Sequence, residues 1–173
     1  MLSNFIRQRA QGLLNVMAGG LNKLGLTPNG LTLIGFAFMC FIGVVLATGN
    51  FALGGMLIIV AGIFDALDGS LARLTNRVTQ FGAFLDSTTD RFAEGAVYLG
   101  IMHAFFQRGI TSIAYLIFLT LLGSLMVSYA RARAEGIGIE MKEGMLTRFE
   151  RIALLIIGLV LTVFFGDAPL LIV

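Results

Sequence analysis

The chain has 173 residues, of which 57% are hydrophobic and 13% are charged, and its formal net charge is +2. Soluble domains are about 45–50% apolar and about 25% charged, so this composition excludes an ordinary water-soluble domain. In a membrane protein lysine and arginine first report orientation, so the small positive charge does not indicate a nucleic-acid partner. Because hydrocarbon offers no hydrogen-bond partner to the backbone, an all-α architecture is expected.

Residues 1–26 resemble an amphipathic helix that lies at the membrane interface, with apolar positions such as Leu13, Leu14 and Met17 between polar ones. Thr27 is suited to N-cap a following helix whose first residue is Pro28. We expect one membrane-embedded domain over residues 1–173, with this interfacial helix followed by a transmembrane bundle over residues 27–173.

Five apolar segments follow, and several approach the roughly 20 residues that a membrane-spanning helix needs. They are residues 31–49, 51–64, 95–106, 109–130 and 152–166. Residues 167–173 resemble the start of a sixth segment, so either the sequence is truncated there or the native chain runs on. The prediction is a polytopic transmembrane helix bundle of five spans plus an incomplete sixth.

The cations indicate the orientation of this bundle. Those assigned to the cytosolic side are Arg7, Arg9, Lys23, Arg73, Arg77, Arg131, Arg133, Lys142, Arg148 and Arg151, with Arg91 close to that side. Only Arg108 falls on the opposite side. Cytoplasmic loops carry an excess of lysine and arginine, so we expect a multi-pass protein of the cytoplasmic membrane with its N-terminus in the cytosol.

Four aspartates occupy the charged stretch that follows the second apolar segment. Asp65 and Asp68 are three residues apart, and Asp86 and Asp90 are four apart. On helices each pair shares one face. A short polar turn at residues 75–77 joins the two helices, which makes them antiparallel neighbours. The spacing predicts a cup of four carboxylates toward the cytosolic end of the bundle.

Such a cup requires a compensating cation, because one aspartate at mid-bilayer costs about 2.5–3.5 kcal/mol and four of them repel one another. Carboxylate oxygens suit Mg²⁺, Mn²⁺ or Ca²⁺, as one ion or as two about 3.5–4 Å apart. The alternative is structural ion pairing with Arg73, Arg77 and Arg91. Four acids at these spacings favour the metal, and Gly69 and Gly82 leave room for the helices and a ligand to approach closely.

These residues resemble the signature of the CDP-alcohol phosphotransferase family. The eight matching positions are Asp65, Asp68, Gly69, Ala72, Arg73, Gly82, Asp86 and Asp90. The resemblance implies a membrane enzyme that moves a phosphatidyl-type group from a CDP-linked lipid to an alcohol. Members usually have six spans, so this chain with five and a stub departs from the pattern at its last helix. Members are also often homodimers, and the resemblance implies the same here.

The resemblance also implies residue roles. Asp65, Asp68 and Asp86 would hold Mg²⁺ or Mn²⁺, and Asp90 would reach a second ion and act as the general base. Gly69, Arg73 and Thr79 would contact CDP-diacylglycerol or its ether-lipid analogue. Asn29 and Thr32 are further candidates for that contact.

Arginines that follow the fourth span and precede the fifth are candidates for the acceptor site. They are Arg131, Arg133, Arg148 and Arg151. Arg131 and Arg133 lie about 200° apart on a helix, so at most one of them points into the cup. The alternative is that these side chains only anchor the protein at the interface.

The sequence around residues 128–135 is similar to the branch of the family that uses inositol 1-phosphate and makes phosphatidylinositol phosphate or its archaeal ether analogue. Glycerol 3-phosphate, which would give phosphatidylglycerophosphate, is the alternative acceptor. L-serine fits less well because it has no phosphate.

A cation transporter and a structural membrane adaptor fit the sequence less well than an enzyme. A cation transporter would distribute acids through the membrane depth, whereas these acids cluster at one end. A purely structural adaptor would leave the cost of four buried acids unexplained. We expect Glu94 to hydrogen-bond to a neighbouring helix, Cys40 to be a packing residue and His103 to have no role.

Overall fold

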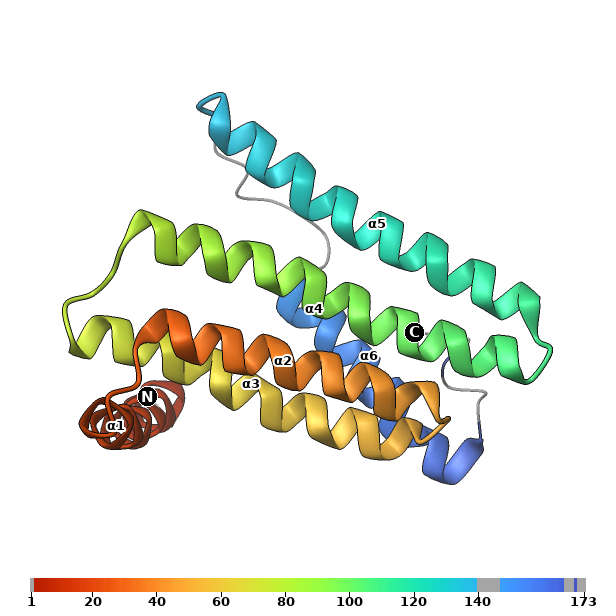
Figure 1. Ribbon diagram of the computed structural model, residues 1–173, viewed down its shortest axis with the longest axis horizontal. Coiled ribbons are helices and arrows are strands. Elements are labelled where there is room, and N and C mark those ends of the chain that lie inside the picture. Colours follow the sequence, from red (N-terminus) through yellow and green to blue (C-terminus); the bar gives the residue numbers. More distant parts are fainter. Residues whose placement is uncertain (1, 140–146, 167–169, 171–173) are drawn as a thin grey trace. The chain divides into compact units, whose positions relative to one another are not determined.

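The computed structural model describes residues 2–139, 147–166 and 170, and the side chains of residues 2–10 and 149 are not described. Its helices are α1 (Leu2–Lys23), α2 (Pro28–Ala47), α3 (Phe51–Leu74), α4 (Gln80–Gln107), α5 (Thr111–Gly136) and α6 (Arg148–Phe165) (Figure 1). No strand occurs among the described residues, which confirms the all-α prediction.

Three helices are long and apolar enough to cross a membrane, namely Pro28–Ala47, Phe51–Leu74 and Thr111–Gly136. They correspond to the first, second and fourth predicted spans, so the chain has the character of a membrane protein. The third predicted span lies within α4, which also carries Asp86 and Asp90. The fifth, apart from its last residue, lies within α6, whose first turn is charged. The predicted stub over residues 167–173 lies outside the described residues except for Leu170, and Lys142 also lies outside them.

Hydroxyl side chains cap three of these helices. Thr27 Oγ1 accepts a hydrogen bond from the Gly30 amide at 3.1 Å, which confirms the predicted cap in front of Pro28. Thr79 Oγ1 likewise accepts from the Gly82 amide at 2.9 Å, at the start of α4. Because the first amides of a helix have no partner within it, such caps determine where the helix begins. Helix α6 begins with a capping box formed by Thr147 and Glu150.

The reversal between α3 and α4 depends on Asn76. Its φ of 52° is in the left-handed region, which asparagine tolerates better than most residues. The Arg77 amide donates to the Ala72 carbonyl at 2.9 Å, and the Asn76 amide donates to the Arg73 carbonyl at 3.3 Å. This Schellman arrangement ends α3 abruptly and turns the chain back, as an antiparallel pair requires.

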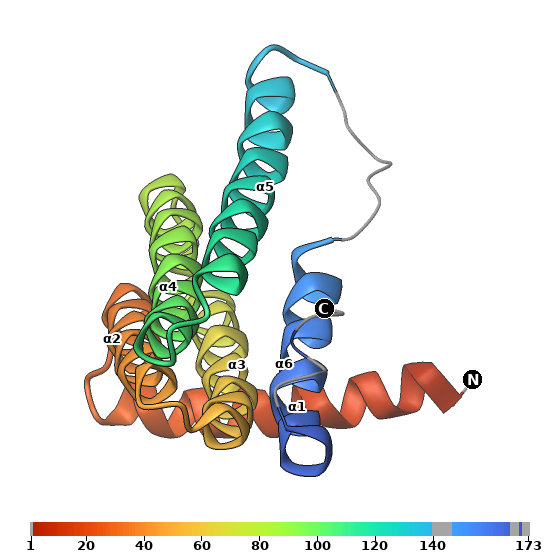
Figure 2. The same ribbon diagram turned by 90° about the vertical axis from the view of Figure 1, so that its right-hand side faces the viewer.

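The chain divides into two compact units, the first of which comprises Met1–Met39 and Val60–Ala93. In this unit α1 lies across the parts of α2 and α3 that belong to it, as Figures 1 and 2 together show. The apolar cluster beneath it consists of Ala18, Leu31, Leu67 and Leu71, with Leu14, Leu21 and Phe64 packed against it. This packing fixes α1 to α2 and α3, and α3 carries the first signature residues.

The second unit comprises Cys40–Ile59 and Glu94–Val173. Two glycines allow close backbone contact within it, because a Cβ built on Gly100 would lie 2.1 Å from the Gly43 carbonyl oxygen. Small residues at helix contacts are typical of membrane proteins. The rings of Phe51 and Phe105 stack at 5.6 Å, and the Arg108 guanidinium lies 5.0 Å from the Phe51 ring centroid.

Candidate active site

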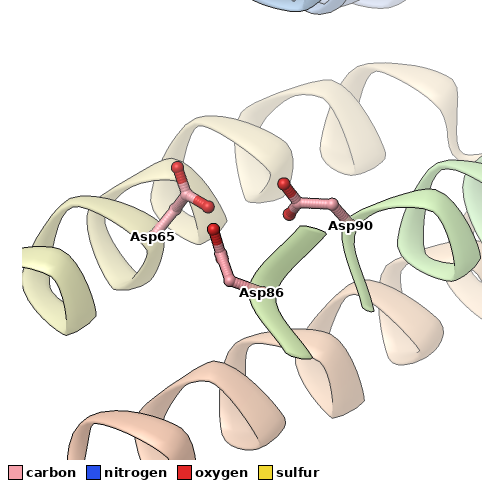
Figure 3. A group of neighbouring side chains, drawn as sticks. All are labelled: Asp65, Asp86 and Asp90. Carbon is pink, nitrogen blue, oxygen red and sulfur yellow. The ribbon is translucent and has the colours of Figure 1, made fainter. Parts of the chain in front are cut away.

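Three of the four predicted acids meet in the first unit. Asp65 on α3 and Asp86 and Asp90 on α4 each offer a carboxylate oxygen, and these oxygens lie within 4.8 Å of one another. Figure 3 shows the three side chains directed toward a common centre. Asp65 is exposed and the other two are half-buried. The sequence spacing correctly predicted that both helices present acids to each other.

Asp68 is held differently from the other three acids. It is only 9% exposed, and its carboxylate accepts a hydrogen bond of 2.8 Å from the Thr32 hydroxyl of α2. The same hydroxyl lies 3.1 Å from the Pro28 carbonyl. The family resemblance suggested Thr32 as a contact for the lipid donor, and not as a residue that orients an acid. The sequence signal that could have suggested this contact is the threonine near the start of the first span, in the helix that precedes the one carrying Asp68.

The donor set suits a divalent cation. Carboxylate oxygens are the hard ligands that Mg²⁺ and Mn²⁺ prefer, and three like-charged groups this close repel one another in the absence of a cation. The ion-pair alternative is met in part, because Arg91 Nη1 lies 3.9 Å from an Asp90 oxygen. The same Nη1 donates a hydrogen bond of 2.6 Å to the Ser87 carbonyl on α4, so the guanidinium is shared between Asp90 and the backbone of its own helix.

Polar side chains expected to contact the lipid donor surround the two signature glycines. A Cβ on Gly69 would lie 3.4 Å from Arg73 Nη1. A Cβ on Gly82 would lie 3.1 Å from Thr79 Oγ1 and 3.2 Å from Asn29 Oδ1. The structure therefore places Asn29 and Thr79 together at the start of α4, where a larger residue than glycine would displace them.

The arginines expected at the acceptor site lie in the second unit. On α5, Arg131 is half-buried and Arg133 is exposed, as expected for residues on opposite sides of a helix. On α6, Arg148 and Arg151 are both half-buried. Arg151 Nη2 donates to Ser128 Oγ of α5 at 3.5 Å, so this pair joins two helices of the same unit.

Glu94 forms the interhelical hydrogen bond that its sequence context predicted. Ser124 Oγ of α5 donates to Glu94 Oε1 at 2.5 Å. Sequence reasoning did not identify Ser124 as the partner, although a serine within an apolar helix is a natural candidate for a buried acid.

Residues 25–172 match the family model described as CDP-alcohol phosphatidyltransferase. The chain is 40% identical over 159 residues to an archaetidylinositol phosphate synthase from Pyrococcus horikoshii, an alignment that covers 91% of this chain and 81% of that protein. It is 35% identical over 162 residues to a phosphatidylinositol phosphate synthase from Mycobacteroides abscessus, covering 92% and 74% of the two chains.

Solved structures of the Mycobacterium tuberculosis phosphatidylinositol phosphate synthase have a similar fold. The form with CDP-DAG bound gives a TM-score of 0.82 at 31% identity and covers 87% of this chain and 77% of that one. The complex with manganese and citrate gives a TM-score of 0.78 at 30% identity, covering 87% and 73%. Since a family model matches most of its length and relatives above 30% identity cover more than two thirds of it, this chain belongs to the CDP-alcohol phosphatidyltransferase family.

Proposed function

We propose that this enzyme transfers the phosphatidyl or ether-lipid phosphatidyl group of a CDP-linked lipid to inositol 1-phosphate and releases CMP. The observation that carries the proposal is the convergence of three carboxylates from α3 and α4 within 4.8 Å. The match to relatives named as synthases of phosphatidylinositol phosphate and archaetidylinositol phosphate supports the acceptor.

In this proposal Asp65, Asp68, Asp86 and Asp90 hold two divalent ions, Mg²⁺ or Mn²⁺. When bound, such ions neutralise charge on the diphosphate and on the departing CMP. Asp68 is oriented for this role by Thr32, whose hydroxyl donates to it. A crystal structure of a relative with manganese and citrate supports divalent-metal use.

The transfer itself needs a nucleophile and a base. The acceptor hydroxyl oxygen attacks the lipid-linked phosphorus, the bond from that phosphorus to the CMP oxygen breaks, and CMP leaves with the bonding electrons. Asp90 takes the hydroxyl proton, a role for which a carboxylate one helical turn from Asp86 is suited. Arg73 beside Gly69 binds the CDP portion of the donor, since a guanidinium fork matches phosphate oxygens. Asn29 and Thr79 beside Gly82 contact the same portion.

The phosphate of the acceptor is assigned to the arginines of the second unit. Arg131, Arg148 and Arg151 are half-buried, and a partly desolvated cation favours an anionic ligand. Arg133 is exposed and is assigned to the interface with the lipid headgroups rather than to the acceptor.

The proposal extends to the setting of the enzyme. It is a multi-pass protein of the cytoplasmic membrane with five spans and its site toward the cytosol, and it forms a homodimer. Helix α1 lies at the interface, which its exposed apolar side chains support, among them Leu13 at 63% and Val16 at 74% exposure. Cysteine accessibility across the membrane tests the topology, and light scattering in detergent tests the dimer.

The decisive experiment measures CMP release by the purified protein with CDP-diacylglycerol or its ether analogue and Mg²⁺ or Mn²⁺. Inositol 1-phosphate, glycerol 3-phosphate, free inositol and L-serine are offered separately. Release with inositol 1-phosphate alone is expected. Release only with glycerol 3-phosphate would replace the acceptor, and activity with free inositol equal to that with its phosphate would remove the arginines from acceptor binding.

A further inference from the structure

The second unit contains a buried polar cluster to which the proposed chemistry gives no role. Glu94 and Tyr98 of α4 are 7% and 8% exposed, and Ser124 of α5 is 4% exposed. Ser124 Oγ donates to Glu94 Oε1 at 2.5 Å. A carboxyl group buried among apolar helices is costly unless a hydrogen-bond partner satisfies it, and Ser124 supplies that partner for Glu94.

The cluster continues to an arginine of the acceptor group. Ser128 lies one helical turn beyond Ser124 on α5, and its hydroxyl accepts from Arg151 Nη2 of α6 at 3.5 Å. Polar side chains thus connect α4, α5 and α6 inside one compact unit.

The four-residue spacing of Ser124 and Ser128 couples the contact with α4 to the contact with α6. Residues four apart on a helix share a face, so Ser124 and Ser128 are presented from the same side of α5. Fixing Ser124 against Glu94 therefore fixes the rotation of α5 about its axis and, with it, the position from which Ser128 meets Arg151. A plain clamp between α4 and α5 would not need the second serine or its contact with α6.

We propose that Glu94 is a positioning residue, which acts through Ser124 and Ser128 to hold the Arg151 guanidinium where it binds the phosphate of the acceptor. This inference rests on the proposed function, which assigns Arg151 to the acceptor. Glu94 itself does not touch the substrate in this proposal.

The test compares alanine variants with variants that keep the hydrogen bond. Glu94→Ala and Ser124→Ala are expected to raise the KM for inositol 1-phosphate by roughly three- to tenfold, the range for the loss of one supporting hydrogen bond. The kcat and the KM for CDP-diacylglycerol stay within about twofold. Glu94→Gln and Ser124→Thr retain an acceptor oxygen and a donor hydroxyl, so both should stay close to the unaltered enzyme.

A matched control lies one turn earlier on the same helix. The Thr120 hydroxyl donates to the carbonyl of Leu116 on its own helix, so Thr120→Val removes a hydroxyl without touching the cluster. It should leave every kinetic constant unchanged. In an Arg151→Ala background, Ser124→Ala should add no further rise in acceptor KM, because the guanidinium that it positions is already gone.

Two outcomes would overturn the inference while leaving the proposed function intact. One is an acceptor KM that does not move in Ser124→Ala, a variant that removes only a hydroxyl and decides the matter even if Glu94→Ala fails to purify. The other is an additive rise in the Arg151→Ala background. If the unaltered enzyme used only glycerol 3-phosphate, the proposed acceptor would fail, and the same KM comparison with glycerol 3-phosphate would still decide whether Glu94 positions Arg151.

Discussion

Replacing Thr32 by valine tests whether a hydroxyl of the first span tunes the acidic site. Valine has nearly the same shape as threonine, so the substitution removes the 2.8 Å hydrogen bond to Asp68 without opening a cavity. A hydrogen bond to a charged group contributes about 1.5–3 kcal/mol. Since 1.4 kcal/mol corresponds to a tenfold change in an equilibrium constant, the expected loss is about tenfold or more.

This loss should fall on the metal rather than on the lipid donor. Removing the partner that orients a carboxylate ligand weakens metal binding, so the metal concentration that gives half-maximal CMP release should rise about tenfold. The rate at saturating Mg²⁺ or Mn²⁺ should stay close to that of the unaltered enzyme. Thr32→Ser keeps the hydroxyl and should restore the original metal dependence.

The control is Thr162→Val, because the Thr162 hydroxyl donates to the Leu159 carbonyl of its own helix at 2.6 Å. It should leave the metal dependence unaltered. An identical metal titration for Thr32→Val and the unaltered enzyme would refute the idea that Thr32 orients Asp68 for metal binding. A rise confined to the KM for CDP-diacylglycerol would instead return Thr32 to the donor site that its sequence position suggested.

Three further outcomes are expected. Asp90→Asn should lower kcat by about 10²–10⁴-fold with the melting temperature retained, and activity within tenfold of the original would remove Asp90 as the base. Gly100→Ala should destabilise the protein by about 1–3 kcal/mol, because the new Cβ would lie 2.1 Å from the Gly43 carbonyl oxygen. A Cβ at Gly95 on the same helix would meet nothing within 4 Å, so Gly95→Ala should leave the melting temperature unchanged in a thermal-shift assay. The backbone amide and hydroxyl of the α6 cap lower the pKa of Glu150 below its ordinary value of 4.5, so its contribution to stability is present above that pH and is lost as the pH falls through the lower folded value. Melting temperatures of the unaltered protein and Glu150→Gln should therefore converge in acid, and a difference that persists there would contradict this account.

The acidic site was the part of the fold most open to prediction from sequence. Helical periodicity determines which face each aspartate occupies, and the polar turn after α3 determines that the next helix returns beside it. These two local rules were enough to bring Asp65, Asp86 and Asp90 together. Sequence reasoning also located the cap at Thr27, because capping depends only on neighbouring residues.

Contacts between helices distant in the sequence could not be predicted in the same way. The bond from Thr32 to Asp68 joins residues 36 positions apart, and that from Ser124 to Glu94 joins residues 30 apart. Such pairs depend on the rotation of each helix against its neighbour, which periodicity within one helix does not determine. The close approach of Gly43 and Gly100 belongs to the same class, since glycine is common in membrane helices and only packing distinguishes one from another.

The hydrogen bond from Thr32 to Asp68 also limits how far the catalytic motif can be separated from its surroundings. A designer who grafted residues 65–90 onto another helical hairpin would transfer all four acids but leave behind the α2 hydroxyl that orients one of them. The smallest transplantable module therefore begins at the first span rather than at the first aspartate.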